Sequence, residues 1–240
     1  MGLSMLKGVL LGDFASSFLA TTLMSEQILL MLCHYNSFTH SSWALRESKA
    51  TFVQELFLTR AGNPFPNPLS CFYVHTLRDC IVNCVASWLL VKPISSVIGW
   101  RHSIFLFVGA GSLSSFCYLF SMEASEKNTN NIANYACASN GAFAGFATLS
   151  LILPRCYTPL FKRIPLTLFG TFYLIICLHN EYIEPGRTET HRAINIRLEN
   201  RSFVGGVFFA LMYSSLFFQT RAGFGMRQIF YNNIKNAAKL

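Results

Sequence analysis

Charged side chains are scarce in this sequence. Lys, Arg, Asp and Glu make up 12% of the 240 residues, whereas soluble globular domains contain about 25%. Hydrophobic residues account for 52% of the chain, and 23 residues are Phe. This composition argues against an ordinary soluble domain and favours a membrane protein.

Other signals are missing as well, and each absence argues against a class of protein. The net charge of +8 is not gathered into a basic run interleaved with aromatics, so we do not expect nucleic-acid binding. Cys80 and Cys84 are one helical turn apart, but no His or carboxylate pattern completes a metal site, so we expect no metal or other cofactor. No low-complexity tract, flexible linker or second repeat divides the chain, which predicts a single domain over residues 1–240.

Apolar windows long enough to cross a hydrocarbon core, roughly 20 residues each, recur along the chain. The first window is interrupted by Lys7, Asp13 and Glu26, and we place its span inside Leu3 to Cys33. The sequence therefore predicts an all-α, polytopic membrane protein with six transmembrane helices. We place them at Phe14 to Leu32, Leu69 to Val91, Ser103 to Ser121, Ile132 to Leu153, Ile164 to His179 and Ser202 to Gln219.

Two stretches lie outside these segments. Residues 220–240 form a basic carboxy-terminal tail, and residues 34–68 form a long first loop that ends in a proline-rich stretch unfavourable to helix. Part of this loop mixes apolar and charged residues, a pattern that fits either an amphipathic helix at the membrane interface or an ordinary surface helix. The residues concerned are Trp43, Phe52, Leu56 and Phe57, with Arg46, Glu47, Lys49 and Glu55.

The distribution of Lys and Arg predicts the orientation of the chain. Six spans place both termini on one side with two short loops, and these two loops contain no Asp or Glu. The basic residues on that side are Lys7, Lys92, Arg101, Arg155, Lys162, Arg163, Arg221, Arg227, Lys235 and Lys239. Because Lys and Arg in short loops stay on the inner side, we expect both termini to face the cytosol or, in a mitochondrion, the matrix.

A run of small residues in the fourth expected span carries a family resemblance. Residues 138–145 read Ala-Ser-Asn-Gly-Ala-Phe-Ala-Gly. This segment resembles the fourth core helix of rhomboid intramembrane proteases, whose motif is small-x-Ser-Gly-Ala-x-x-Gly, and Asn140 stands at the serine position. An amide cannot act as the nucleophile of such a reaction.

Two further segments resemble the same family. In the sixth expected span, residues 203–206 read Phe-Val-Gly-Gly and are similar to the His-Leu-Gly-Gly start of the last rhomboid core helix, with Phe203 at the position of the general base. In the second span Asn83 matches the asparagine that helps to hold the oxyanion in the family. Asp79 stands where the family usually has a histidine, and Ser95 stands at a glutamate position.

The resemblance implies a rhomboid-like bundle that has kept its packing without its catalytic dyad. We expect Gly141 and Gly145 to pack against Gly205 and Gly206, because small residues let two membrane helices approach closely. The resemblance thus implies no enzymatic activity.

We also expect a polar pocket. Arg78 and Asp79 are ionisable residues inside a span, where they are costly unless paired or hydrated. In the rhomboid arrangement, Asp79 and Asn83 would lie on one helix face directed towards Asn140 and Phe203. This pocket is interpreted either as a contact surface for passing polypeptide or as an internal polar lock.

The function implied by the resemblance is that of a non-catalytic subunit of a membrane protein-translocation complex. The chain looks most like the rhomboid-like subunits of the kinetoplastid mitochondrial inner-membrane translocase. That likeness implies import across or into the inner membrane, both termini in the matrix, and contacts with other membrane subunits, with transiting polypeptide and with the lipid bilayer.

Three alternatives remain open from the sequence. A derlin-like role in quality control at the endoplasmic reticulum would be accompanied by a Trp-Arg motif in the first loop, and none is found between His34 and Pro68. An intramembrane serine protease would have to use Ser139, which lies about 100° around the helix from Asn140. An unrelated six-helix membrane protein would resemble the rhomboid family only by accident.

Overall fold

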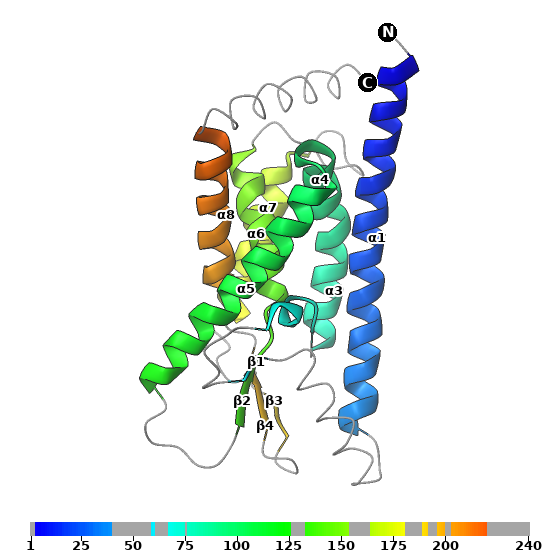
Figure 1. The fold of residues 1–240 in the computed structure, drawn as a ribbon. Helices are drawn as coiled ribbons and strands as arrows, with labels where there is room; N and C mark the ends of the chain where they lie inside the picture. The colour runs from blue at the N-terminus through cyan, green and yellow to red at the C-terminus, as the bar shows by residue number, and fades with distance from the viewer. Residues whose placement is uncertain are drawn as a thin grey trace.

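The protein is mainly helical and carries a small sheet at one end, as the computed structural model shows in Figure 1. It describes residues 3–39, 59–60, 67–74, 76–125, 133–153, 164–180, 189–191, 196–199 and 203–219. The helical class expected from the sequence is confirmed. The α-helices are α1 (Leu3–Thr39), α3 (Leu77–Ala86), α4 (Lys92–Ile98), α5 (Trp100–Ser125), α6 (Ser139–Ile152), α7 (Leu166–Leu178) and α8 (Phe203–Gln219).

The helix expected at Leu69 begins later because two caps divide this part of the chain. The Oδ1 atom of Asn67 accepts a hydrogen bond from the backbone N–H of Leu69 at 3.0 Å and caps a short 3-10 helix, η1 (Pro68–Cys71). The Oγ1 atom of Thr76 accepts from the N–H of Asp79 at 3.1 Å and starts α3. A hydroxyl at this position satisfies one of the free N–H groups of the first turn, so the helix begins at Leu77.

The same helix extends beyond the expected end at Val91. A π-helical turn, η2 (Ser87–Val91), joins α3 to α4, and the N–H of Lys92 donates to the carbonyl of Ser87. Pro93 has no N–H and its ring collides with the carbonyl four residues earlier, which explains the widened turn. The rod from Leu77 to Ile98 ends at Gly99, where a φ of 89° lets the chain turn into α5.

A four-stranded sheet, which the sequence analysis did not predict, lies at the end of the bundle away from the first residues of α1 (Figure 1). Its strands are β1 (Thr59–Arg60), β2 (Ala133–Ala136), β3 (Glu189–His191) and β4 (Ile196–Glu199), in the order β1-β2-β4-β3. Strand β2 runs antiparallel to β1 and parallel to β4, and β3 runs antiparallel to β4. The fourth span expected at Ile132 is therefore wrong at its start, and its helix begins at Ser139.

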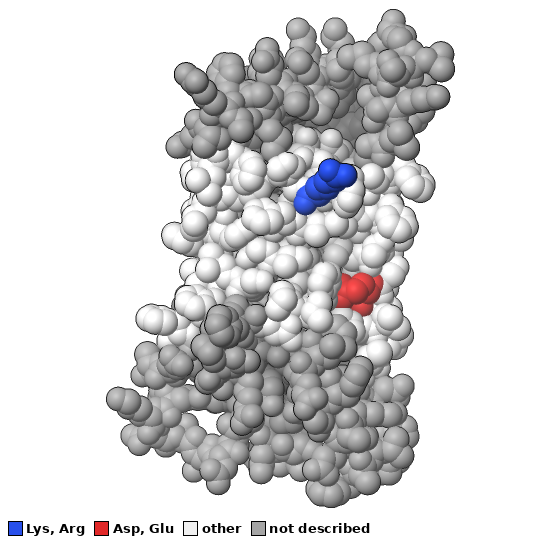
Figure 2. All heavy atoms as spheres, viewed as in Figure 1, with Lys and Arg blue, Asp and Glu red and all other residues white. Residues whose placement is uncertain are grey.

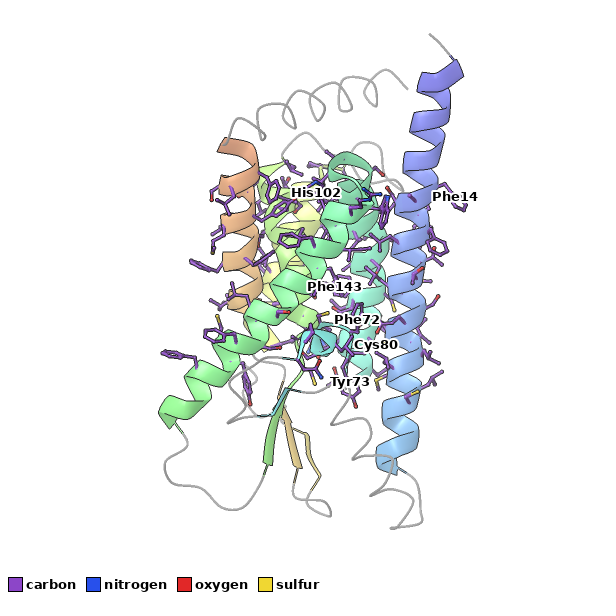
Figure 3. All side chains as sticks on the ribbon, in the orientation of Figure 1. Phe14, Phe72, Tyr73, Cys80, His102 and Phe143 are labelled. Carbon is purple, nitrogen blue, oxygen red and sulfur yellow. The ribbon has the colours of Figure 1, made fainter. Side chains whose placement is uncertain are left out.

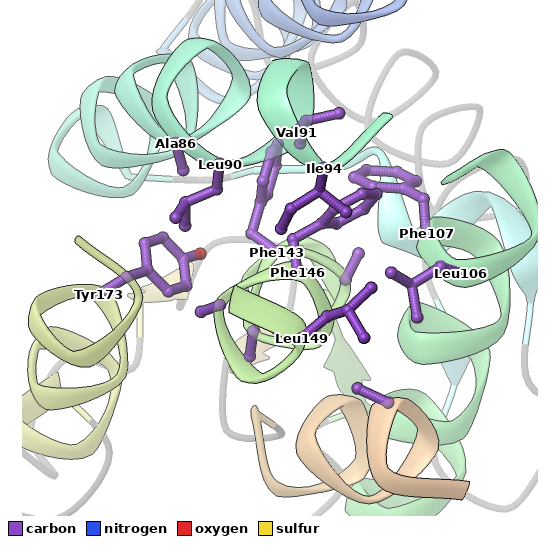
Figure 4. Packing of buried hydrophobic residues seen from close by; sticks show 14 of the residues in the cluster. Ala86, Leu90, Val91, Ile94, Leu106, Phe107, Phe143, Phe146, Leu149 and Tyr173 are labelled. Carbon is purple, nitrogen blue, oxygen red and sulfur yellow. The ribbon is translucent and has the colours of Figure 1, made fainter. Parts of the chain in front are cut away.

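The centre of the bundle is α6. Every residue from Ser139 to Ser150 is buried, and α6 packs against α5, α7, α8 and η2. Figure 4 shows aromatic side chains of α6 directed at these neighbours. The ring of Phe143 lies 5.3 Å from that of Phe107 on α5 and 6.4 Å from that of Tyr173 on α7. The first pair is edge-to-face and the second is tilted, and ring contacts of this kind add to the energy of burial.

The outer surface of the bundle is apolar. Large hydrophobic side chains are exposed on α1, α3, α5, α7 and α8, among them Phe14 (70%), Phe120 (72%) and Phe172 (63%). Phe14 points away from the bundle in Figure 3, and the face drawn in Figure 2 is almost free of charge over its described part. Exposed apolar surface on this scale is typical of contact with lipid or with another protein.

Two helical segments in the described part of the chain are long and apolar enough to cross a membrane. They are Phe14–Cys33, inside α1, and Leu77–Ile98. Residues Leu166–Leu178 and Phe203–Phe217 form shorter apolar helices. A bundle of six spans is therefore not confirmed, although α1 begins and α8 ends at the same end of the molecule (Figure 1).

The two stretches expected outside the spans are only partly described. Helix α1 extends to Thr39, so the first residues of the 34–68 loop are helical. The expected amphipathic segment around Trp43 to Phe57 lies outside the described residues. The same holds for the tail at 220–240.

Helix α8 reaches the bundle through two adjacent glycines that face different neighbours. A Cβ atom on Gly206 would overlap the carbonyl oxygen of Gly141 on α6, and one on Gly205 would lie 2.5 Å from the Cα of Ser114 on α5. On the α6 side, a Cβ on Gly145 would lie 3.6 Å from the carbonyl oxygen of Gly206. The backbone of α8 thus lies in the groove between α5 and α6.

Substituting either glycine of this pair should loosen α8. We expect Gly206→Ala and Gly205→Ala each to cost about 1–3 kcal/mol, because the new methyl group meets backbone atoms that cannot move alone. The loss would appear as a lower midpoint of thermal unfolding of the protein purified in mild detergent. Val204→Ala, on the exposed side of the same turn, is the matched control and should change the midpoint little.

Candidate functional site

The two positions that match the rhomboid dyad lie at the first turns of adjacent helices. Asn140 is the second residue of α6 and is 6% exposed, and Phe203 is the first residue of α8 and packs against the buried core. Because Gly206 contacts Gly141, the first turn of α8 lies beside the first turn of α6. Neither an amide nor a phenyl ring can transfer the proton that acyl transfer requires.

Ser139, the alternative nucleophile, is fully buried at the start of α6. Its Oγ atom has no hydrogen-bond partner, and the Oγ of Ser95 is likewise buried without one. A serine becomes nucleophilic when a base lies within hydrogen-bond reach. No group among the described residues provides that contact to Ser139.

Asn83 is the centre of a buried hydrogen-bond chain that joins three helices. Its Oδ1 atom accepts a bond of 2.8 Å from the hydroxyl of Tyr173 on α7, and its Nδ2 donates at 3.2 Å to the Oε1 of Gln27 on α1. The Nε2 of Gln27 then donates at 2.7 Å to the backbone carbonyl of Phe72. Because the three side chains are buried, each bond satisfies a polar group that water does not reach.

Asp79 lies one turn before Asn83 on α3 and is also buried, at 6% exposed. Its Oδ1 accepts a bond of 3.3 Å from the Nδ2 of Asn180, just beyond the end of α7. Arg78, the neighbouring ionisable residue, is half-buried. Asp79 thus bonds to Asn180, and Asn83 bonds to Tyr173 on α7 and to Gln27 on α1. The expected position of Asp79 and Asn83 opposite Asn140 and Phe203 stays a prediction.

Several of the residues that make this site were not singled out from the sequence. They are Gln27, Thr76, Tyr173 and Asn180. Gln27 carried a usable signal, because a carboxamide inside an apolar span requires a partner. Tyr173 carried none, since Tyr is common in apolar helices.

The cysteines of α3 take part in helix packing. Cys80, on the α1 side of α3 in Figure 3, donates its thiol proton to the carbonyl of Gln27 at 3.6 Å. Cys84 donates in the same way to the carbonyl of Met24 at 3.7 Å. Among the described residues, no group of three or more His, Cys, Asp and Glu side chains is arranged to hold a metal ion.

Comparisons of the chain with protein-family models, with curated proteins and with solved structures give no match. The family resemblance thus depends on the sequence of three helical segments.

The chemistry available at this site is hydrogen bonding between neutral amides and hydroxyls, with one carboxyl at its edge. Such groups can hold helices together or bind the peptide groups of another segment.

Removing the centre of the hydrogen-bond chain should destabilise the bundle. We expect Asn83→Leu to cost about 1–3 kcal/mol, because the hydroxyl of Tyr173 and the Oε1 of Gln27 are left buried without partners. Tyr173→Phe should cost less, and the two changes together should cost less than their sum because they share one bond. Thermal unfolding in detergent measures all three variants. Thr171→Val removes an exposed hydroxyl from α7 and serves as control.

Proposed function

We propose that this chain is a non-catalytic rhomboid-like subunit of a membrane protein-translocation complex. Among known complexes, the mitochondrial inner-membrane translocase fits the resemblance best, with the termini in the matrix. The observation that carries the proposal is the pairing of α6 with α8, which start at Asn140 and Phe203 and are held together through Gly141 and Gly206. A bundle that keeps this glycine contact without the catalytic dyad is suited to assembly with other subunits or to contact with polypeptide.

The apolar exterior supports a membrane location for helices beyond the two long spans. Phe172 and Leu168 on α7 and Phe208 on α8 are 56–63% exposed, as expected for helices that face lipid. Helix α6 is enclosed by its neighbours from Ser139 to Ser150, so its 14 residues need not match the full thickness of the bilayer. We therefore propose that the six helical rods cross the membrane as one bundle.

The polar site supplies the hydrogen-bonding groups on which the proposed role depends. Asp79 and Asn180 lie where α3 begins and α7 ends, near the sheet end of the bundle. Amide and carboxyl groups at this depth can exchange their internal bonds for bonds to the backbone of a passing polypeptide. We propose that the site contacts polypeptide in transit.

A fluorophosphonate probe tests the absence of protease chemistry. We expect no labelling of Ser139 in purified protein, because its hydroxyl is buried without a base. Ser139→Ala provides the background level, and mass spectrometry of the labelled peptide provides the readout. Specific labelling that disappears in Ser139→Ala would establish a serine hydrolase instead.

Affinity purification in mild detergent followed by mass spectrometry tests the assignment to a complex. We expect recovery of translocase subunits in fixed proportion to this chain. Recovery of the protein alone, or with quality-control components of the endoplasmic reticulum, would contradict the proposal.

Asp79→Leu then separates the contact role from a purely structural one. We expect the complex to remain intact while photo-crosslinking of an arrested client to α3 falls several-fold, because the polar surface is lost. Ile81→Ala, on the exposed side of α3, should leave crosslinking unchanged. If Asp79→Leu altered neither assembly nor crosslinking, Asp79 would have no part in client contact.

A further inference from the structure

Glu26 is an acidic residue in the middle of the candidate span Phe14–Cys33 that the polar site does not use. Its side chain is half-buried, and its Oε1 is enclosed without a hydrogen-bond partner. Its Oε2 receives only a long bond of 3.4 Å from the Nε2 of Gln27. A carboxyl group at this depth is costly unless another group pairs with it.

On the same helix, the neighbouring Gln27 has hydrogen-bond partners for both atoms of its carboxamide group. Its Nε2 donates to the carbonyl of Phe72, and its Oε1 accepts from Asn83. Gln27 belongs to the inner seam of α1, which packs against α3, η2 and α4. The buried residues of this inner seam follow a four-three spacing and are Ser16, Ala20, Leu23, Gln27 and Leu30.

Glu26 belongs to a second row of residues with the same kind of spacing. The outer seam consists of Ala15, Thr22, Glu26, Leu29 and Cys33, in which three pairs of positions are seven apart (15 and 22, 22 and 29, 26 and 33). Its side chains are half-buried or exposed, and Leu29 is 61% exposed. A seven-residue repeat keeps one face of a helix in contact with a second helix, and a single polar residue in it sets the register.

Charge decides the kind of helix that fits the outer seam. No basic side chain of the described residues forms an ion pair with Glu26, and the acidic and basic patches on the described part of the face in Figure 2 lie apart from each other. A purely apolar partner helix would leave the carboxyl unpaired in a medium of low dielectric constant. A Lys or Arg at the matching level would neutralise it and donate the missing hydrogen bond.

We propose that the outer seam of α1 is the docking site for a transmembrane helix of a partner subunit, and that this helix carries a Lys or Arg opposite Glu26. Rotation about the side-chain bonds of Glu26 turns its carboxyl from the edge of the inner seam onto the outer one. The small side chains of Ala15 and Thr22 allow close approach, and Leu29 provides apolar contact. The proposal rests on the membrane placement of α1 and is independent of client contact at Asp79.

Binding of model transmembrane helices tests this proposal. The full-length protein, labelled with a fluorescent donor, is reconstituted in phosphatidylcholine vesicles with an acceptor-labelled Leu/Ala helix of 21 residues that carries Lys, Leu or Glu at its centre. We expect the Lys helix to bind about tenfold more tightly than the Leu helix, a factor typical of one polar contact between membrane helices. Energy transfer as a function of acceptor density gives the affinities.

Charge variants identify the residue responsible. Glu26→Gln preserves the shape of the side chain and should make the affinities for the Lys and Leu helices equal. Glu26→Lys should reverse the preference in favour of the Glu helix. Phe172→Gln, a change at an exposed position on α7, should leave the preference intact.

Two outcomes would overturn the proposal. One is equal binding of the Lys and Leu helices to the unaltered protein, and the other is a preference for Lys that persists in Glu26→Gln. An unchanged thermal midpoint of Glu26→Gln shows that the variant is folded. The assay contains neither client nor translocase subunits, so its failure would not contradict the proposed function. Failure of the co-purification would, in turn, not contradict binding of the Lys helix at Glu26.

Discussion

Burial of α6 from Ser139 to Ser150 is the constraint on which the arrangement of the other helices depends. A helix that is buried from Ser139 to Ser150 must find a partner for every side, and here the four sides are occupied in different ways. Glycine contacts bring α8 to backbone distance, aromatic rings fill the spaces towards α5 and α7, and aliphatic side chains of η2 cover the remaining side. Small residues and large rings thus alternate around one axis, as close packing requires.

Polar bonds add what apolar packing cannot provide in such a bundle. In the membrane setting proposed above, apolar side chains pack nearly as favourably against lipid as against another helix, so apolar contacts specify neighbours weakly. The hydrogen-bond chain from Tyr173 through Asn83 and Gln27 to the carbonyl of Phe72 forms only when α7, α3 and α1 have one particular relative height. These few bonds therefore define the register of helices whose outer surfaces are uniform.

Hydropathy and spacing predicted the position of a helix in each of the six apolar segments, because burial in lipid or protein leaves a direct trace in composition. The first helical residue was predicted less well: Thr76 and the pairing of β2 with β4 determine where α3 and α6 begin, and apolar content records neither. The small sheet joins short segments that are far apart in sequence, so no local pattern of residues predicts it. At the site, Asp79 and Asn83 were identifiable as polar residues in a span, but their partners Tyr173 and Asn180 follow from the packing of α7.

The π-helical turn at Ser87–Val91 shifts the phase of the whole rod. Below it the buried positions are Asp79, Cys80, Asn83 and Ala86, and above it they are Ile94, Ser95 and Ile98. One additional residue in a turn rotates everything after it by about 100° relative to an uninterrupted α-helix. The lower half of the rod can therefore present its amide side chain to α1 and α7, while the upper half presents aliphatic side chains to the core. A single proline thus sets the rotation between the polar face of the lower half and the apolar face of the upper half.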